Sequence, residues 1–310
     1  MAQRKALILG ASSLVGRHFL GRIGGEPIAT YNTRPIVGGV HFDAVRMGLR
    51  DIVPDPDALS VAMLLLGDTN PDACAGDPVR SQAVNVDAIK SIVDRLAEWR
   101  VPVVFTSSEF VFDGQAGNYR ESDVAKPILV YGRQKLEIEQ YIERRVRDYA
   151  IVRLPKIYGV VVNDGTLFSN WIRQIKAGGE IRCAHNQRFS PLFIDDAVTA
   201  LTTFATTPLR GLFHVAGLTG ASRLELLELL LASIRRFRSV DTRVTPCSID
   251  DFKVLERRPH DVTMCSDAFV AATGARPRTV ADVIASMVER VFASPIGESD
   301  LAGSKAYGSA

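Results

Sequence analysis

The sequence has little of what marks membrane, secreted or nucleic-acid-binding proteins. No apolar run reaches the ~18 residues that a membrane span needs, so we expect no transmembrane segment. The 37 Lys and Arg nearly balance 35 Asp and Glu, and a net charge of +2 does not favour nucleic acid as a partner. There is no internal repeat and no low-complexity block. What remains is a chain of 310 residues, enough for one large α/β domain or a main domain with a smaller lobe.

Cysteine is also scarce. Cys74, Cys183, Cys247 and Cys265 are scattered and form no CxxC pair. This favours neither a zinc site nor a disulfide framework, and it predicts reduced, buried thiols in a cytoplasmic protein. The N-terminal stretch MAQRKALILGASS has basic residues before an apolar run, as a signal peptide does. The apolar run is very short and meets a glycine, so we interpret it as a first β-strand.

Short apolar runs alternate with amphipathic segments through the first half of the chain. Runs without polar interruption are typical of parallel strands buried on both faces. Their alternation with helices predicts an α/β fold with a doubly wound, Rossmann-like parallel sheet. The expected strands cover 5–9, 28–31, 61–66, 101–106, 150–154 and 211–215. The expected helices begin near 14 and cover 84–99, 129–144, 167–176, 195–204, 223–237 and 281–292. The small, polar segment 295–310 is expected to be a flexible tail.

The motif LILGASSLVG joins the first expected strand to the first expected helix. In a doubly wound fold, this turn directs a helix N-terminus at a dinucleotide pyrophosphate. Gly10 allows the tight turn and Gly16 allows close packing of the helix on the strand. Ser13 stands where a middle glycine would be expected, although its hydroxyl can itself bond phosphate. Two glycines alone also suit an ordinary strand-to-helix turn, but the position in the first βα unit favours a cofactor.

The segment after the second expected strand, TYNTRP, contains Arg34 and no acid. An acid at this place accepts the 2′-hydroxyl of NAD, whereas a cation suits the 2′-phosphate of NADP. Arg34 can form two parallel hydrogen bonds with a phosphate. A solvated surface arginine is the alternative. The sequence therefore favours NADP(H), with NAD(H) as the alternative cofactor.

A hydroxyl pair and a Tyr-Lys pair follow the strand at 101–106. Tyr131 and Lys135 are four residues apart on one expected helix, so their side chains share a face. A nearby ammonium lowers the pKa of a phenol from ~10, which suits Tyr131 for proton transfer. Ser108 follows a buried strand at the sheet edge where ligands bind. Each feature arises often by chance; their order after a glycine turn is less easily accidental.

The chain resembles the extended short-chain dehydrogenases/reductases. Within them it is similar to the dTDP-4-dehydrorhamnose reductases and related nucleotide-sugar reductases and epimerases. The stretches that carry the resemblance are GASSLVG, SSEFVFDG, ESDVAKPILVYGRQKLEIEQ, IVRLPKIYG, RFSPLFIDDA and RRPHDVTM. The resemblance implies a dinucleotide-binding domain over 1–160, to which 190–217 returns, and a smaller, mixed C-terminal substrate lobe over 161–294. It also implies that a homodimer is an expected assembly.

The resemblance assigns roles to individual residues. Ser108, Tyr131 and Lys135 match the catalytic hydroxyl, tyrosine and lysine, and Asn85 matches the asparagine that helps to hold a proton-relay water. The pyrophosphate would lie along Gly10, Ser13, Leu14, Val15 and Gly16. Asp43 and Ala44 match a loop that contacts adenine, and Leu66 and Gly67 match a loop that contacts ribose. The chain departs from the family at Ser13, at Glu109 and Phe110, where Asp-Tyr is usual, and in the loop LLLGDTNPDAC.

Arg257 and Arg258 lie in the stretch ERRPHDVTM, which relatives use near their substrate. Guanidinium groups recognise phosphates bidentately, so these residues are candidates for binding the substrate diphosphate; a solvated basic loop is the alternative. Asp195 and Asp196 open an expected helix, where carboxylates offset the helix dipole. We therefore expect no metal site there.

Two hypotheses for function follow. The first is an NADP(H)-dependent reductase, or a related epimerase, acting on a keto group of a nucleotide-activated sugar. The second is a non-catalytic, NADP-binding regulatory subunit that resembles the beta subunit of methionine adenosyltransferase. The altered glycine turn makes the second credible, and the presence of Ser108, Tyr131 and Lys135 favours the first.

Overall fold

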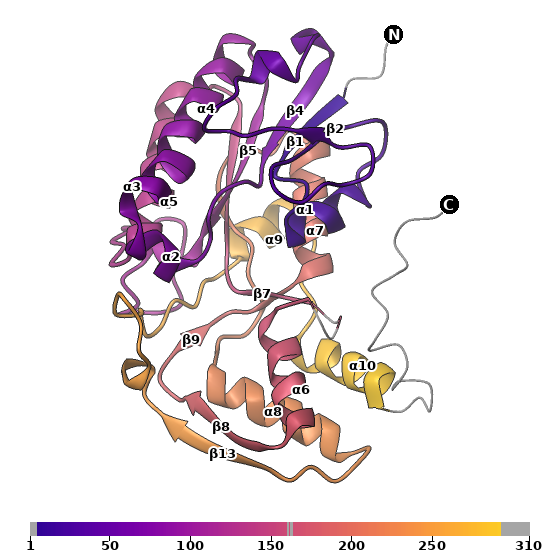
Figure 1. The fold of residues 1–310 in the computed structure, drawn as a ribbon, viewed down its shortest axis with the longest axis vertical. Coiled ribbons are helices and arrows are strands. Elements are labelled where there is room, and N and C mark those ends of the chain that lie inside the picture. Colours follow the sequence, from indigo (N-terminus) through magenta and orange to yellow (C-terminus); the bar gives the residue numbers. More distant parts are fainter. Residues whose placement is uncertain (1–4, 160, 162–163, 293–310) are drawn as a thin grey trace.

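The computed structural model describes residues 5–159, 161 and 164–292 of the chain (Figure 1). The segment 295–310, predicted as a flexible tail, lies outside the described residues. No helix within these ranges combines the length and the apolar character needed to span a bilayer.

A parallel sheet forms the upper part of the molecule in Figure 1. Across the described residues it has seven strands in the order β11-β6-β5-β4-β1-β2-β3, and every pairing between neighbours is parallel. Their bounds are β1 (Lys5–Leu9), β2 (Ile28–Tyr31), β3 (Val40–His41), β4 (Leu59–Leu64), β5 (Val103–Ser108), β6 (Tyr149–Leu154) and β11 (Gly211–His214). The chain leaves β1 towards β2 and β3, and then returns to place β4 on the other side of β1. The expected doubly wound, Rossmann-like sheet is confirmed.

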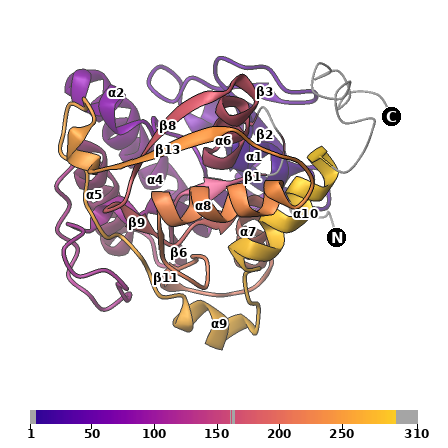
Figure 2. The same cartoon turned by 90° about the horizontal axis from the view of Figure 1, so that it is seen from below.

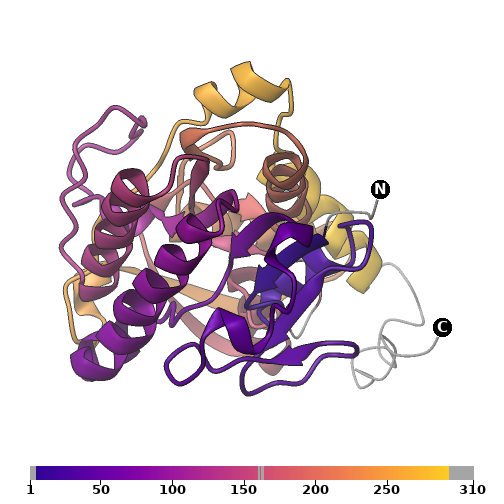
Figure 3. The same ribbon diagram turned by 90° about the horizontal axis from the view of Figure 1, so that it is seen from above.

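Helices cover both faces of this sheet (Figure 3). The face with Leu7 and Leu9 packs against the helices α4 (Ala88–Glu98) and α5 (Val130–Arg145). The face with Ala6 and Ile8 packs against the helices α1 (Leu14–Leu20), α7 (Ile194–Thr206) and α9 (Asp267–Thr273). Adjacent strand residues point to opposite faces, so the uninterrupted apolar run of β1 supplies both cores.

A C-terminal lobe with a third hydrophobic core lies below the sheet in Figure 1, and this lobe faces the viewer in Figure 2. The lobe contains α6 (Leu167–Ala177), β8 (Gly179–Ala184), α8 (Arg223–Arg235), β13 (Thr242–Cys247) and α10 (Val280–Phe292). In this lobe β8 and β13 pair in parallel, and α8 contributes Leu226, Leu227 and Leu230 to the core. The leucine-rich helix expected at 223–237 is therefore a core helix.

Short strands connect the two parts. The strand β7 (Ile157–Tyr158) pairs with β10 (Leu192–Phe193), and β9 (Arg188–Phe189) pairs with β12 (Ala221–Ser222). Between them the chain returns to the large sheet through α7 and β11. The division into a dinucleotide-binding domain and a substrate lobe stays a prediction about function.

Most expected elements are present with shifted ends. The strands expected at 61–66 and 101–106 lie two residues away, at 59–64 and 103–108. The helix expected at 84–99 is instead a π-helical turn, Ala83–Asp87, followed by α4. The helices α2 (Pro71–Gly76), α3 (Pro78–Gln82) and α9 were not predicted, and neither were the strands β3, β8 and β13.

Candidate active site

The glycine turn lies at the carboxyl end of β1, beside β4. Gly10 has φ of +88°, and a Cβ there would lie 2.8 Å from the Leu65 backbone. A Cβ on Gly16 would lie 2.4 Å from the Gly10 carbonyl oxygen. Side chains are therefore excluded at both positions by the turn itself. Ser13 caps α1, because its Oγ accepts a hydrogen bond of 3.0 Å from the Gly16 amide.

Ser108, Tyr131 and Lys135 come together in the structure. Ser108 is the last residue of β5, and the other two lie in the first turns of α5, which packs against β5. All three are buried, with exposures of 7%, 5% and 5%. A side-chain hydrogen bond joins Tyr131 to Ser108. The Lys135 ammonium lies 5.8 Å from the centre of the Tyr131 ring and donates a 2.9 Å hydrogen bond to the Thr106 carbonyl.

The protonation of this group differs from the expectation that Lys135 lowers the pKa of Tyr131. Burial raises the pKa of Tyr131 well above its ordinary value, and the hydrogen bond with Ser108 opposes this rise. Burial also lowers the pKa of Lys135 to about 8, while the Glu139 carboxylate works in the other direction. Tyr131 is consequently a neutral phenol at neutral pH, which suits the donation of a proton.

Asn85 lies in the π-helical turn and is 3% exposed. Its Oδ1 accepts a 2.7 Å hydrogen bond from the Asp68 amide, and its Nδ2 donates to the Asp68 carbonyl at 3.0 Å. Nδ2 also donates to Oε1 of Gln134 at 2.9 Å, and Gln134 is the neighbour of Lys135 on α5. The side chain thus ties the loop after β4 to the helix that carries Tyr131 and Lys135. The π-helical turn that carries Asn85 is of a kind that is frequent at functional sites.

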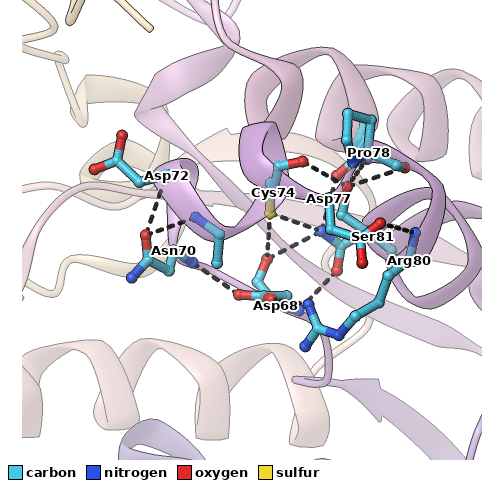
Figure 4. A network of polar contacts seen from close by, with 11 residues as sticks. Asp68, Asn70, Asp72, Cys74, Asp77, Pro78, Arg80 and Ser81 are labelled. Carbon is cyan, nitrogen blue, oxygen red and sulfur yellow. Dashed lines mark hydrogen bonds and ion pairs between the residues drawn. The ribbon is translucent and has the colours of Figure 1, made fainter. Parts of the chain in front are cut away.

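Figure 4 shows the polar network around this loop. Arg80 donates to Oδ2 of Asp68 at 2.8 Å, and Ser81 donates to the Cys74 carbonyl at 3.0 Å. Asn70 caps α2 by accepting hydrogen bonds from the amides of Asp72 and Ala73. Burial raises the pKa of the Cys74 thiol to about 11, so this cysteine is a protonated structural residue.

The remaining residues expected to bind cofactor follow the strands β2, β3 and β4. Arg34 is exposed in the loop after β2. Asp43 and Ala44 are partly buried after β3, where Oδ1 of Asp43 accepts from the Val45 amide. Leu66 and Gly67 follow β4, and Leu66 packs against the core on the α4 side. In a parallel sheet these ends share one edge with Gly10 and Ser108, and this edge is where doubly wound folds bind ligands.

The two candidate phosphate-binding arginines have different surroundings. The Arg257 side chain is 72% exposed and pairs with Asp250 at 3.2 Å. The Arg258 side chain is 10% exposed and pairs with Asp72 of α2 at 2.6 Å. Arg258 also contributes to lowering the pKa of Lys156, so the two cations are neighbours. Arg258 is thus held in a largely buried ion pair and Arg257 in an exposed one, and the contact of either with a substrate stays a prediction.

A group of ionisable residues around Glu109, which follows Ser108, was not predicted from the sequence. Glu109 is 3% exposed, and within the described part of the chain its Oε2 has no hydrogen-bond partner. Burial raises its pKa to about 8, although Lys156 and Arg223 favour the carboxylate. Lys156 keeps solvent exposure, yet enough protein surrounds its ammonium to lower its pKa. The only indication in the sequence was the departure from Asp-Tyr at this position.

A second buried group of polar residues was also not predicted, and it lies one turn after Lys135 on α5. The carboxylate of Glu139 accepts hydrogen bonds from Arg153 at 3.0 and 2.6 Å and from the Ser107 hydroxyl. Arg153 lies 3.3 Å from Nε2 of His214, whose pKa is lowered to about 4 by burial and then by Arg153. Through these contacts the ion pair of Glu139 and Arg153 links α5 to β6, and Ser107 and His214 extend the link to β5 and β11.

Among the residues that the structure describes, no group of three or more His, Cys, Asp and Glu side chains is arranged to hold a metal ion. Asp195 and Asp196 open α7, as expected, and both pair with Arg278. His260 pairs with Asp250 at 3.0 Å.

Comparison with known proteins places this geometry in a family. The family model described as RmlD substrate binding domain matches residues 4–292. A dTDP-4-dehydrorhamnose reductase of Sinorhizobium fredii is 26% identical over 253 residues, 77% of this chain and 83% of the relative. The beta subunit of methionine adenosyltransferase 2 of Bos taurus is 25% identical over 235 residues, 69% of this chain and 67% of the relative.

Solved structures support the same fold. A dTDP-4-dehydrorhamnose reductase of Bacillus anthracis, in complex with NADP, matches with a TM-score of 0.76 at 18% identity, over 92% of this chain and 98% of that one. The resemblance inferred from the sequence is confirmed, as is the predicted oxidoreductase class. The chain belongs to the RmlD substrate binding domain family, which is part of the extended short-chain dehydrogenases/reductases.

Proposed function

We propose that the protein is an NADP(H)-dependent reductase that acts on a keto group of a nucleotide-activated sugar. The observation that carries the proposal is the buried group of Ser108, Tyr131 and Lys135 at the ligand-binding edge of the sheet. The similarity to the Sinorhizobium fredii reductase supports the substrate class.

The residues at this edge fit a dinucleotide. The turn at Gly10 leads directly into α1, and the amides at the start of a helix favour phosphate groups. The loop after β2 offers the cation of Arg34 and no acid, which suits a 2′-phosphate. We assign the pyrophosphate to the turn 10–16, and the 2′-phosphate to Arg34. When bound, NADPH supplies a hydride.

The chain's own residues supply the remaining chemistry. Ser108 donates a hydrogen bond to the carbonyl oxygen of the substrate and orients it. The neutral Tyr131 phenol gives its proton to that oxygen while the carbonyl carbon receives the hydride, so the ketone becomes an alcohol. Lys135 stabilises the resulting phenolate, and Asn85 helps to hold the water that relays a proton back to this group. Arg258 is the candidate for the diphosphate.

The test is a panel of nucleotide-linked ketosugars incubated with NADPH or NADH, followed by nicotinamide absorbance. We expect NADPH oxidation with at least one ketosugar, and loss of turnover in Tyr131→Phe. The matched control Tyr141→Phe removes a half-buried phenol from the same helix, which donates a hydrogen bond to Asp94 of α4, and is expected to keep activity. Turnover that survives in Tyr131→Phe contradicts the proposal. Epimerisation without net NADPH consumption would assign the related epimerase activity instead.

A non-catalytic regulatory subunit is the second candidate, favoured by the similarity to the methionine adenosyltransferase beta subunit. It predicts that nicotinamide fluorescence changes on binding and that no ketosugar promotes oxidation. The homodimer and the cytoplasmic location stay predictions, which size-exclusion chromatography and cell fractionation test.

A further inference from the structure

The helix that carries Tyr131 begins without a cap of its own. Leu129 occupies the N-cap position of α5 and makes no side-chain cap hydrogen bond, and no acidic residue lies in the first turn. The first amides of a helix lack partners within the helix, and its N-terminus carries partial positive charge. The amide of Val130, directly before Tyr131, therefore needs an acceptor from elsewhere in the fold.

Glu256 supplies that acceptor from a distant part of the chain. Both of its carboxylate oxygens lie 3.0 Å from the Val130 amide nitrogen. Nη2 of Arg133, in the same helical turn, lies 3.3 Å from Oε1 of Glu256. The Glu256 side chain is only 18% exposed. A carboxylate thus stands at the end of the helix where the dipole favours it.

The residues around Glu256 are held against a second helix. The Leu255 amide donates to Oδ1 of Asp72 at 3.0 Å, and Arg258 pairs with Oδ2 of the same residue. Arg258 also donates to the Glu256 carbonyl at 3.1 Å. The segment 255–258 is therefore fixed at two places beside the large sheet: at α2 through Asp72, and at the start of α5.

We propose that Glu256 is a positioning residue, which fixes the first turn of α5 and thereby the place of the Tyr131 phenol relative to Ser108. Because Glu256 is two residues from Arg258, the same segment carries a candidate phosphate ligand and the cap of the catalytic helix. The expected effect on turnover rests on the proposed function, whereas the expected effect on the first turn of α5 and on the place of Tyr131 does not.

Two measurements without substrate test the structural part. In Glu256→Ala, amide exchange in the peptide spanning 129–136 should be roughly fivefold faster, as the loss of a helix cap allows. In protein labelled with 3-fluorotyrosine, the Tyr131 resonance, assigned by its absence in Tyr131→Phe, should shift or broaden. Glu256→Gln keeps an acceptor and should give smaller effects.

Glu225→Ala is the matched control. Glu225 is also a carboxylate at a helix N-terminus, where it accepts from the Ser222 amide at 2.6 Å, but its helix is α8. This variant should lose stability and leave the Tyr131 resonance in place. A Tyr131 resonance in Glu256→Ala that superimposes on that of the wild type overturns the proposal, and so does unchanged exchange over 129–136.

Steady-state kinetics distinguish a positioning role of Glu256 in catalysis from a role in stability alone. With a ketosugar that the wild type reduces, Glu256→Ala should lower kcat roughly tenfold and change KM for NADPH less than about twofold. An unchanged kcat overturns the positioning role. If the wild type reduces no ketosugar, the proposed function fails, and the fluorine spectrum and the exchange rates still decide the role of Glu256.

Discussion

Replacement of Glu109 by glutamine tests whether this buried carboxyl is protonated in the folded protein. Its pKa is about 8 in the fold, against 4.5 when unperturbed, because burial disfavours the carboxylate. Between these values the folded protein keeps a proton that the unfolded chain has released. The stability of the wild type therefore falls as pH rises through this window. Glu109→Gln keeps the size and polarity of the side chain and removes the titration.

The size of the effect follows from the width of the window. One pH unit within it changes the free energy of unfolding by about 1.4 kcal/mol for one proton. Between about pH 5.5 and about pH 7.5, the variant should gain roughly 2–3 kcal/mol of stability relative to the wild type. Urea denaturation followed by circular dichroism at the two pH values measures this difference. Glu143→Gln, which alters an exposed glutamate on α5, is the control and should show no such gain.

A constant stability difference between Glu109→Gln and the wild type at both pH values would refute this reasoning. It would mean that Lys156 and Arg223 outweigh burial and hold Glu109 as a carboxylate at neutral pH. The active-site edge would then carry one more negative charge beside Tyr131, and the phenol would be still harder to ionise.

Three further predictions concern other charged groups. His214 has a pKa of about 4 in the fold against 6.5 unperturbed, so the unfolded chain takes up a proton first and stability falls as pH drops through this window. His214→Gln should flatten this acid limb in urea denaturation. Arg258→Ala should raise KM for the nucleotide sugar at least about tenfold, whereas Arg257→Ala, at an exposed pair, should change it less than about twofold in steady-state kinetics. Lys135 loses its proton near pH 8 in the fold, so kcat/KM for reduction should fall as pH rises through that value. Stability should not fall with it, because the unfolded chain keeps that proton up to 10.5, and Lys135 therefore contributes increasing stability over this range.

The large sheet was predictable because its strands are buried on both faces and leave uninterrupted apolar runs, as in KALIL. The strands β8 and β13 gave no such pattern. They are partly exposed, polar residues interrupt their apolar ones, and they pair across more than fifty residues of intervening chain. The π-helical turn at Asn85 was equally hidden, since it accompanies the bonds that Asn85 makes to Asp68, a residue of another loop.

The identities of the candidate catalytic residues could be predicted, but their charge states could not. Tyr131 and Lys135 were recognisable from their spacing on one helix face together with their order after the glycine turn and the family resemblance. Both pKa values depend on burial, and that of Lys135 depends also on the Glu139 carboxylate, which Arg153 and Ser107 hold in place. The same reason explains why Glu109 and Glu256 were missed: each acts through partners that only the fold brings near.

Burial of Tyr131 and Lys135 together has a chemical consequence for the direction of proton transfer. Burial disfavours the charged form of both groups, raising the pKa of the phenol and lowering that of the ammonium. A phenolate at Tyr131 is therefore costly unless a positive charge lies beside it. The neutral phenol can give its proton to a developing alkoxide. The hydrogen bond with Ser108 lowers the pKa of Tyr131 and partly offsets the effect of burial. Reduction of a ketone begins with the phenol in the state that the fold already favours, while oxidation of an alcohol begins with the state that the fold opposes.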